Sequence, residues 1–211
     1  MPKTIIFTSS NKAKIARYKP YIEEFGYIFK SLLDFESELA SPAETGNNEQ
    51  ENAEIKAKYY WEILNHHQNL ENTLILSEDS GMNLKGVSEI DNPKKDIKQP
   101  ILEKFGELKP EYFIQYYSDL ARKYGGKLEL DWIFGFAVFD GKTLESVSII
   151  TPSYLVDRPK LPIDDFYPLN SLLTVLNNGN EIYLADLTKI QWKEIWDVDL
   201  IHSLKHFLGK L

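Results

Sequence analysis

The chain has 211 residues and a formal net charge of -8, and its 43% hydrophobic and 27% charged residues are ordinary for a soluble globular protein. The acidic balance argues against broad nucleic-acid binding, and the lack of cysteine excludes disulfides, thiolate nucleophiles and cysteine zinc sites. There is no apolar run long enough to span a bilayer and no signal-peptide pattern at the start, so we expect a cytoplasmic protein without a membrane partner.

The first predicted elements are a strand over residues 4–8, a polar loop and a helix over residues 15–25. The N-terminus of a helix offers unpaired N–H groups that favour an anion, and a lysine in the first turn adds positive charge. Asn11 and Lys14 are therefore candidate phosphate contacts. The alternative is that Ser10 or Asn11 only caps the helix while Lys14 is solvated.

A second strand is predicted over residues 27–33, followed by an acidic loop over residues 34–50 and a helix from about Glu49 to His66. On that helix Asn52 and Lys56 are four residues apart, which places them on one face that could look into a site. The same face could equally be the solvated side of an amphipathic helix. The predicted inward stripe consists of Ala53, Ala57, Tyr60 and Leu64.

A short apolar run beginning at Leu74 predicts a buried strand that stops at two adjacent carboxylates, Glu78 and Asp79, and then turns at Gly81. Neighbouring residues on a strand point to opposite faces, so we expect only Asp79 to face the site. Carboxylate oxygens suit magnesium or the activation of water. The alternative is that these residues form a simple polar turn.

In the second half, a short helix is predicted near residues 101–105 and a longer one over residues 111–124, whose aromatic stripe suits a core or a dimer surface. A hairpin is predicted over residues 131–150, with its turn at Asp140-Gly141. The histidines near the end of the chain, His202 and His206, are interpreted as surface residues.

Three of these segments, in order, resemble the motifs of the inosine triphosphate pyrophosphatase family. Residues 9–14 resemble its Thr-Gly-Asn-x-x-Lys opening, residues 44–57 its Glu-Thr-Gly and Glu-Asn-Ala-x-x-Lys-Ala segment, and residues 77–81 its acidic Ser-Gly motif. The resemblance covers residues 3–86 well and the remainder only in outline.

The resemblance implies magnesium-dependent hydrolysis of a nucleoside triphosphate, of the inosine or xanthosine type, to the monophosphate and pyrophosphate. Glu44 would bind the metal, and Asp79 would serve as general base or metal ligand. By the match, Lys14 and Lys56 would hold the triphosphate and Asn11 would orient it. Ser10, Asn52, Ser80 and Phe166 are further candidate substrate contacts. The implied fold is an α/β protein with a mixed twisted sheet and flanking helices. By the same resemblance, the chain would form a single domain over residues 1–211, with two lobes around a central cleft, and the protein would be a homodimer.

Two departures concern the base. The segment with which the family cradles the purine is only echoed by residues 165–170, where Phe166 or Tyr167 could stack on a base or simply pack. The family's Ser-His-Arg signature should fall near Trp196, and neither its histidine nor its arginine is there. Base preference is therefore not predicted.

The second hypothesis is a nucleotide-binding or regulatory protein that kept the phosphate contacts and lost turnover. If the motif order arose by chance, its residues would be scattered in the structure.

Overall fold

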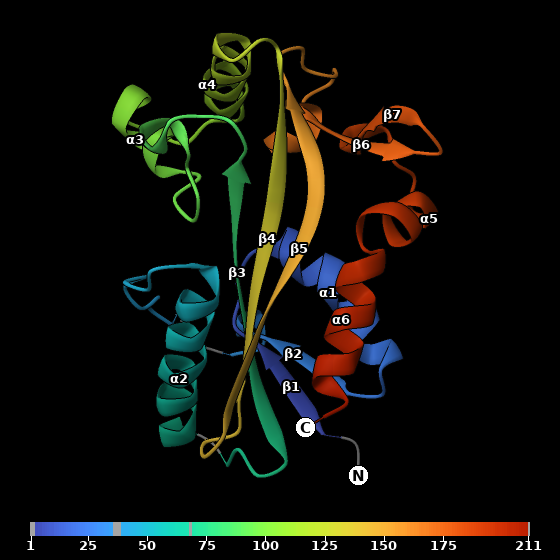
Figure 1. Ribbon diagram of the computed structural model, residues 1–211. Helices are drawn as coiled ribbons and strands as arrows, with labels where there is room; N and C mark the ends of the chain where they lie inside the picture. The colour runs from blue at the N-terminus through green and yellow to red at the C-terminus, as the bar shows by residue number, and fades with distance from the viewer. Residues whose placement is uncertain (1–2, 36–38, 68, 211) are drawn as a thin grey trace. The chain divides into compact units, whose positions relative to one another are not determined.

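The computed structural model describes residues 3–35, 39–67 and 69–210 (Figure 1). Over these residues the chain forms a seven-stranded sheet in the order β2-β1-β3-β4-β5-β6-β7, with helices between the strands. Parallel and antiparallel pairs both occur, so the predicted α/β class with a mixed sheet is confirmed. No helix within these residues is long and apolar enough to cross a membrane.

The chain divides into two compact units. The first comprises Met1–Ser80, Phe134–Ile149 and Phe207–Leu211, and the second comprises Gly81–Ile133 and Ile150–His206. All the candidate site residues except Phe166 belong to the first unit. That the two units make up a single two-lobed domain stays a prediction.

The first unit is built on parallel strands. Its elements in chain order are β1 (Thr4–Phe7), α1 (Lys12–Glu24), β2 (Ile28–Ser31), α2 (Glu49–His67) and the first part of β3 (Thr73–Leu84). Strand β1 pairs in parallel with both β2 and β3, and Phe7 lies opposite Leu76. The residues that follow Phe7 therefore lie beside the continuation of β3 after Leu76, at the carboxyl end of β1, where parallel strands commonly place ligand sites.

One cluster of the core of the first unit lies between α2 and the sheet. The predicted stripe of α2 is confirmed, because its four residues are buried and pack with Ile6, Ile75 and Ala137. Strand β2 ends at Ser31, earlier than predicted, because the chain tightens there into a 3-10 turn over Leu32–Asp34. Helix α1 begins three residues earlier than predicted, at Lys12, and ends one residue earlier, at Glu24.

Strand β3 corrects one prediction. The chain does not turn after Asp79, because the strand continues to Leu84. Apolar residues resume beyond the carboxylates, and both Met82 and Leu84 are buried. Glu78 and Asp79 consequently lie inside a strand and are themselves buried, so each needs a partner for its charge.

The second unit contains the remaining elements, three of which, β4, β5 and α6, continue into the first unit. These are α3 (Gln99–Phe105), α4 (Pro110–Lys123), β4 (Lys127–Phe139), β5 (Leu144–Val156), β6 (Leu173–Asn177), β7 (Asn180–Tyr183), α5 (Lys189–Gln191) and α6 (Val198–Leu208). The predicted helices near residues 101–105 and 111–124 are confirmed. So is the hairpin, whose turn is held by N–H groups of Lys142 and Thr143 donating to Asp140. His202 and His206 are exposed, as predicted.

Gly135 on β4 allows the first turn of α2 to lie directly against the sheet. A Cβ atom at this position would come within 2.4 Å of the backbone nitrogen of Gln50 and 2.5 Å of the backbone oxygen of Glu49. Backbone atoms inside a helix cannot move aside as the end of a flexible side chain can. The absence of a side chain at residue 135 therefore sets how closely the start of α2 approaches the sheet.

Replacing Gly135 with alanine is expected to lower the free energy of unfolding by about 1–3 kcal/mol, because overpacking costs this much in a well-packed core. Chemical denaturation monitored by circular dichroism measures the loss. Gly179→Ala serves as the control, since a Cβ there meets nothing within 4 Å and only its φ of +80° adds strain. An alanine at residue 135 that leaves stability unchanged would contradict the argument.

Candidate functional site

The first part of the site is an ion pair between α1 and β3. The Asn11 side chain caps α1 by accepting hydrogen bonds from the backbone nitrogens of Ala13, at 2.9 Å, and Lys14, at 3.3 Å. The Lys14 ammonium lies 2.5 Å from Oε2 of Glu78, whose side chain is only 1% exposed. Asn11 thus caps the helix, as the alternative interpretation predicted. Lys14, in contrast, is not a freely solvated lysine, because a buried carboxylate holds it.

The second part is a cluster around Lys56 of α2. Its ammonium lies 2.7 Å from Oε1 of Glu44 and 2.9 Å from Oδ1 of Asp79. One nitrogen therefore joins the loop before α2 to the middle of β3. Because both carboxylates contact the same atom, they lie close enough together to share one cation.

The pKa of Lys56 reflects these contacts. Burial by itself would lower the pKa of this ammonium, but the charge and hydrogen bond of Asp79, together with those of Glu44, raise it above its ordinary value. Lys56 is therefore charged at neutral pH, although its side chain is largely buried. A permanent positive charge between two carboxylates is the central electrostatic feature of the first unit.

Asn52 completes the cluster from one turn before Lys56. Its side-chain nitrogen donates to Oδ2 of Asp79 at 2.9 Å, and its side-chain oxygen accepts from the backbone nitrogen of Gly46 at 2.9 Å. Both oxygens of Asp79 are thus occupied, one by Lys56 and the other by Asn52. The predicted common face of Asn52 and Lys56 is confirmed, because both side chains contact Asp79.

The strand alternation predicted for β3 is also visible in these contacts. Asp79 contacts the side chains of α2, whereas Glu78 contacts α1. The sequence argument selected Asp79 and did not assign Glu78 to the site. The signal that could have added it was the buried strand itself, because a carboxylate inside a buried strand must find a cation.

Three other predicted contacts are not part of this network. Ser10 is exposed in the loop before α1, and Ser80 is partly buried on β3. Phe166 belongs to the second unit and is 75% exposed, on a loop where Asp164 accepts the N–H groups of Phe166 and Tyr167. The roles of Ser10, Ser80 and Phe166 stay predictions.

The donor set around Glu44 and Asp79 suits magnesium. Magnesium prefers hard oxygen ligands and is commonly bound by one or two carboxylates together with substrate phosphates. Within the described part of the chain, no three carboxylate or histidine side chains are grouped to hold an ion by themselves. The Lys56 ammonium between the two carboxylates nonetheless marks a position where this chain already binds positive charge.

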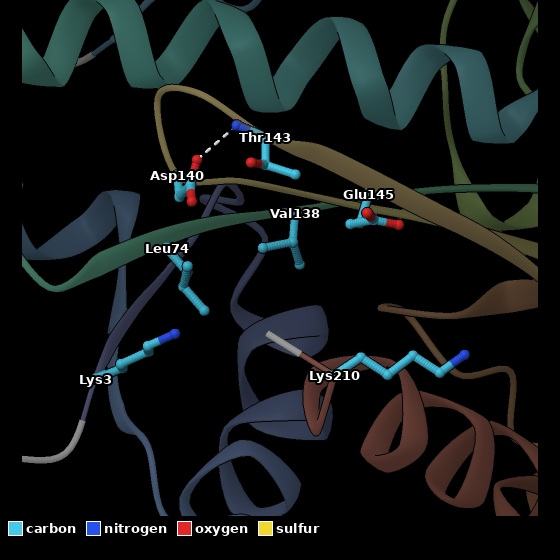
Figure 2. Close-up of a pocket in the computed structure, with 7 residues that line it drawn as sticks. All are labelled: Lys3, Leu74, Val138, Asp140, Thr143, Glu145 and Lys210. Carbon is cyan, nitrogen blue, oxygen red and sulfur yellow. Dashed lines mark hydrogen bonds between the residues drawn. The ribbon is translucent and has the colours of Figure 1, made fainter.

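A pocket of about 210 Å³ lies elsewhere in the first unit (Figure 2). It is lined by Lys3, which precedes β1, and by Leu74 near the start of β3, together with Asp140 and Lys210. It therefore lies toward the amino ends of β1 and β3, whereas the ion pairs lie at and beyond the carboxyl end of β1. None of the predicted site residues lines this pocket.

Comparison with known proteins matches the part of the chain that carries the ion pairs. The sequence model of the Ham1 family matches residues 5–90. The dITP/XTP pyrophosphatase of Lactococcus lactis is 34% identical over 82 residues, which span 39% of this chain and 37% of that protein. The dITP/XTP pyrophosphatase of Dictyoglomus thermophilum is 30% identical over a stretch of the same length, again 37% of that protein. Residues 5–90 are thus similar to the Ham1 family.

The predicted resemblance to the inosine triphosphate pyrophosphatase family is thereby confirmed. Solved Ham1 structures also share the fold over nearly the whole chain. The HAM1 protein of Coxiella burnetii has a TM-score of 0.73 at 16% identity and covers 100% of both chains. The Ham1 protein of Staphylococcus aureus has a TM-score of 0.71 at 18% identity, covering 99% of both. Sequence likeness to the Ham1 family is thus concentrated in residues 5–90, whereas the fold continues beyond them.

Removing the Lys14 charge is expected to destabilise the protein, because it leaves the Glu78 carboxylate buried without its partner. Lys14→Met should lower the free energy of unfolding by about 3 kcal/mol, and the double variant with Glu78→Gln should recover most of this loss. Lys19→Met on the same helix is the control. Its pair with Glu23 is exposed, so the loss should be about 0–1 kcal/mol. A double variant no more stable than Lys14→Met would contradict the pairing.

Proposed function

We propose that this protein hydrolyses a nucleoside triphosphate of the non-canonical purine type to the monophosphate and pyrophosphate, using magnesium. The observation that carries the proposal is that two adjacent residues of β3 each bind a lysine inside the first unit: Glu78 binds Lys14 of α1, and Asp79 binds Lys56 of α2, which also binds Glu44. These residues come from four separate segments of the chain. A triphosphate needs positive charge around its oxygens and a carboxylate beside the attacking water, and this group of side chains contains both.

The names of the relatives support this substrate class. Two relatives are named dITP/XTP pyrophosphatase, and their likeness to this chain amounts to 37% of the length of each. The matched region, residues 5–90, contains the whole ion-paired network. The similarity therefore falls on the part of the chain where the proposed chemistry needs specific side chains.

In the proposed reaction, Lys14 and Lys56 bind the non-bridging oxygens of the triphosphate and compensate its negative charge. Glu44 and Asp79 hold the magnesium ion. When bound, that ion would withdraw charge from the phosphate oxygens and so favour attack at phosphorus. Glu78 keeps Lys14 positioned beside β3 until a phosphate competes for the ammonium.

Asp79 also orients the attacking water and accepts its proton. A bond forms between the water oxygen and the phosphorus that keeps the nucleoside, and the bond from that phosphorus to the bridging oxygen breaks. Pyrophosphate leaves with the electron pair of the broken bond, and the proton passes from Asp79 to solvent. The monophosphate and pyrophosphate are then the two products.

Pyrophosphate release from a panel of nucleoside triphosphates tests this function. We expect release from dITP and XTP that exceeds release from ATP and GTP, and no release when magnesium is omitted. Magnesium-dependent nucleotide binding without release from any substrate would instead support a nucleotide-binding or regulatory protein. Neither the predicted homodimer nor the cytoplasmic location is needed for this outcome.

Asp79→Asn is expected to lower kcat by about 10²- to 10⁴-fold, because the amide cannot accept the proton of the water. Rates of pyrophosphate release at saturating nucleotide and magnesium measure the effect. Asp96→Asn, at an exposed aspartate of the second unit, should leave the rate unchanged. An Asp79→Asn variant with wild-type kcat would remove Asp79 from the chemistry.

A further inference from the structure

Asn52 has an unusual position for a residue predicted to touch the substrate. It is 1% exposed, and its amide makes two hydrogen bonds within the protein. The nitrogen holds Asp79 and the oxygen holds the backbone of Gly46. A single side chain thus connects the two segments that carry Glu44 and Asp79, the proposed metal ligands.

The loop carrying Glu44 is fitted closely to Asn52. A Cβ atom added at Gly46 would lie 2.8 Å from both the backbone nitrogen and the side-chain oxygen of Asn52, and 2.7 Å from Cβ of Glu51. Glu51 holds the next loop residue, because its carboxylate accepts from the backbone and side-chain nitrogens of Asn47 at 2.8 Å each. Two successive residues of α2 therefore fix two successive residues of the loop.

In the proposed reaction Lys56 exchanges its carboxylate partners for the triphosphate, whereas Asn52 keeps its hydrogen bonds. Lys56 can leave its carboxylates for the triphosphate, because its ammonium can turn toward any anion. Asn52 is neutral and both of its polar groups are engaged in the protein interior. When Lys56 turns to a phosphate, the Asn52 hydrogen bonds are the connection that still holds Asp79 in register with the loop of Glu44.

We infer that Asn52 is a positioning residue that fixes the separation of Glu44 and Asp79 for a divalent cation and does not contact the nucleotide. This inference rests on the proposed function, since it takes Glu44 and Asp79 as the metal ligands. Hydrogen bonds to ligating side chains typically change metal affinity by about 10–100-fold when they are removed. The amide of Asn52 is such a partner for Asp79, and through Gly46 it also holds the Glu44 loop.

The test is binding of Mn²⁺ to the full chain in the presence of a non-hydrolysable nucleoside triphosphate analogue, which draws Lys56 away from the carboxylates, followed by electron paramagnetic resonance. Asn52→Leu, which keeps the number and branching of the side-chain non-hydrogen atoms, should raise the Kd for Mn²⁺ by about 10–100-fold. Gly46→Ala should raise it as well, because the added methyl displaces the loop from Asn52 without altering a carboxylate. Gln115→Leu, at an exposed amide of α4, is the matched control and should leave the Kd unchanged.

Kinetics separate positioning from substrate contact. A positioning role predicts that high Mn²⁺ restores most of kcat in Asn52→Leu, with KM for the nucleotide near the wild-type value. An unchanged Kd for Mn²⁺ with a raised KM for the nucleotide would overturn the inference. Should Asn52→Leu fail to fold, the Mn²⁺ affinity of Gly46→Ala decides: an unchanged Kd overturns the inference and a raised one supports it.

The inference and the proposed function fail separately. Wild-type protein that binds Mn²⁺ but releases no pyrophosphate would refute the function and leave the role of Asn52 intact. Wild-type protein that releases pyrophosphate while Asn52→Leu binds Mn²⁺ normally would refute only the inference. Absence of Mn²⁺ binding by the wild-type chain would overturn the inference directly.

Discussion

The structure of the first unit depends on the neutralisation of two carboxylates inside strand β3. Glu78 and Asp79 are buried, and a buried charge is costly unless it is paired and hydrogen-bonded. The compensating ammonium groups come from different helices, Lys14 on α1 and Lys56 on α2. The two helices are separated in the chain by β2. Because their lysines pair with adjacent residues of β3, both helices must lie against that strand. The charges on β3 therefore constrain the assembly of the whole unit.

Stability alone does not account for these charges. Replacing a buried ion pair with well-packed apolar residues is often neutral or stabilising, because the attraction rarely exceeds the cost of removing both ions from water. Asp79 has more partners than a simple ion pair provides. Lys56 and Asn52 occupy its two oxygens, and Lys56 also binds Glu44. A site that must later accept an anionic substrate has a reason to keep such charges. The proposed triphosphate chemistry supplies that reason.

The sequence predicted the features that depend on local pattern. The inward stripe of α2, the hairpin turn at Asp140 and the shared face of Asn52 and Lys56 all follow from short spacings. The end of β3 was predicted wrongly, because two adjacent carboxylates are also typical of a turn and the partners that let them remain in a strand are distant in sequence. The pairing of Lys14 with Glu78 was missed for the same reason, since it joins residues separated by 64 positions.

Sequence likeness to the Ham1 proteins is stronger in residues 5–90 than elsewhere, and the difference between packing and charge pairing explains why. Packing constrains volume and polarity, which many sequences satisfy, so a fold can persist at 16% identity over the whole chain. A charged network constrains individual side chains, because a carboxylate inside a strand tolerates few alternatives to a lysine at the right position. Residues 5–90, where sequence likeness survives, contain every member of that network. The second unit contains Phe166 and Trp196, and both lie outside the matched residues. Sequence likeness concentrated in the region that contains these ion pairs is therefore what the proposed phosphate chemistry would preserve.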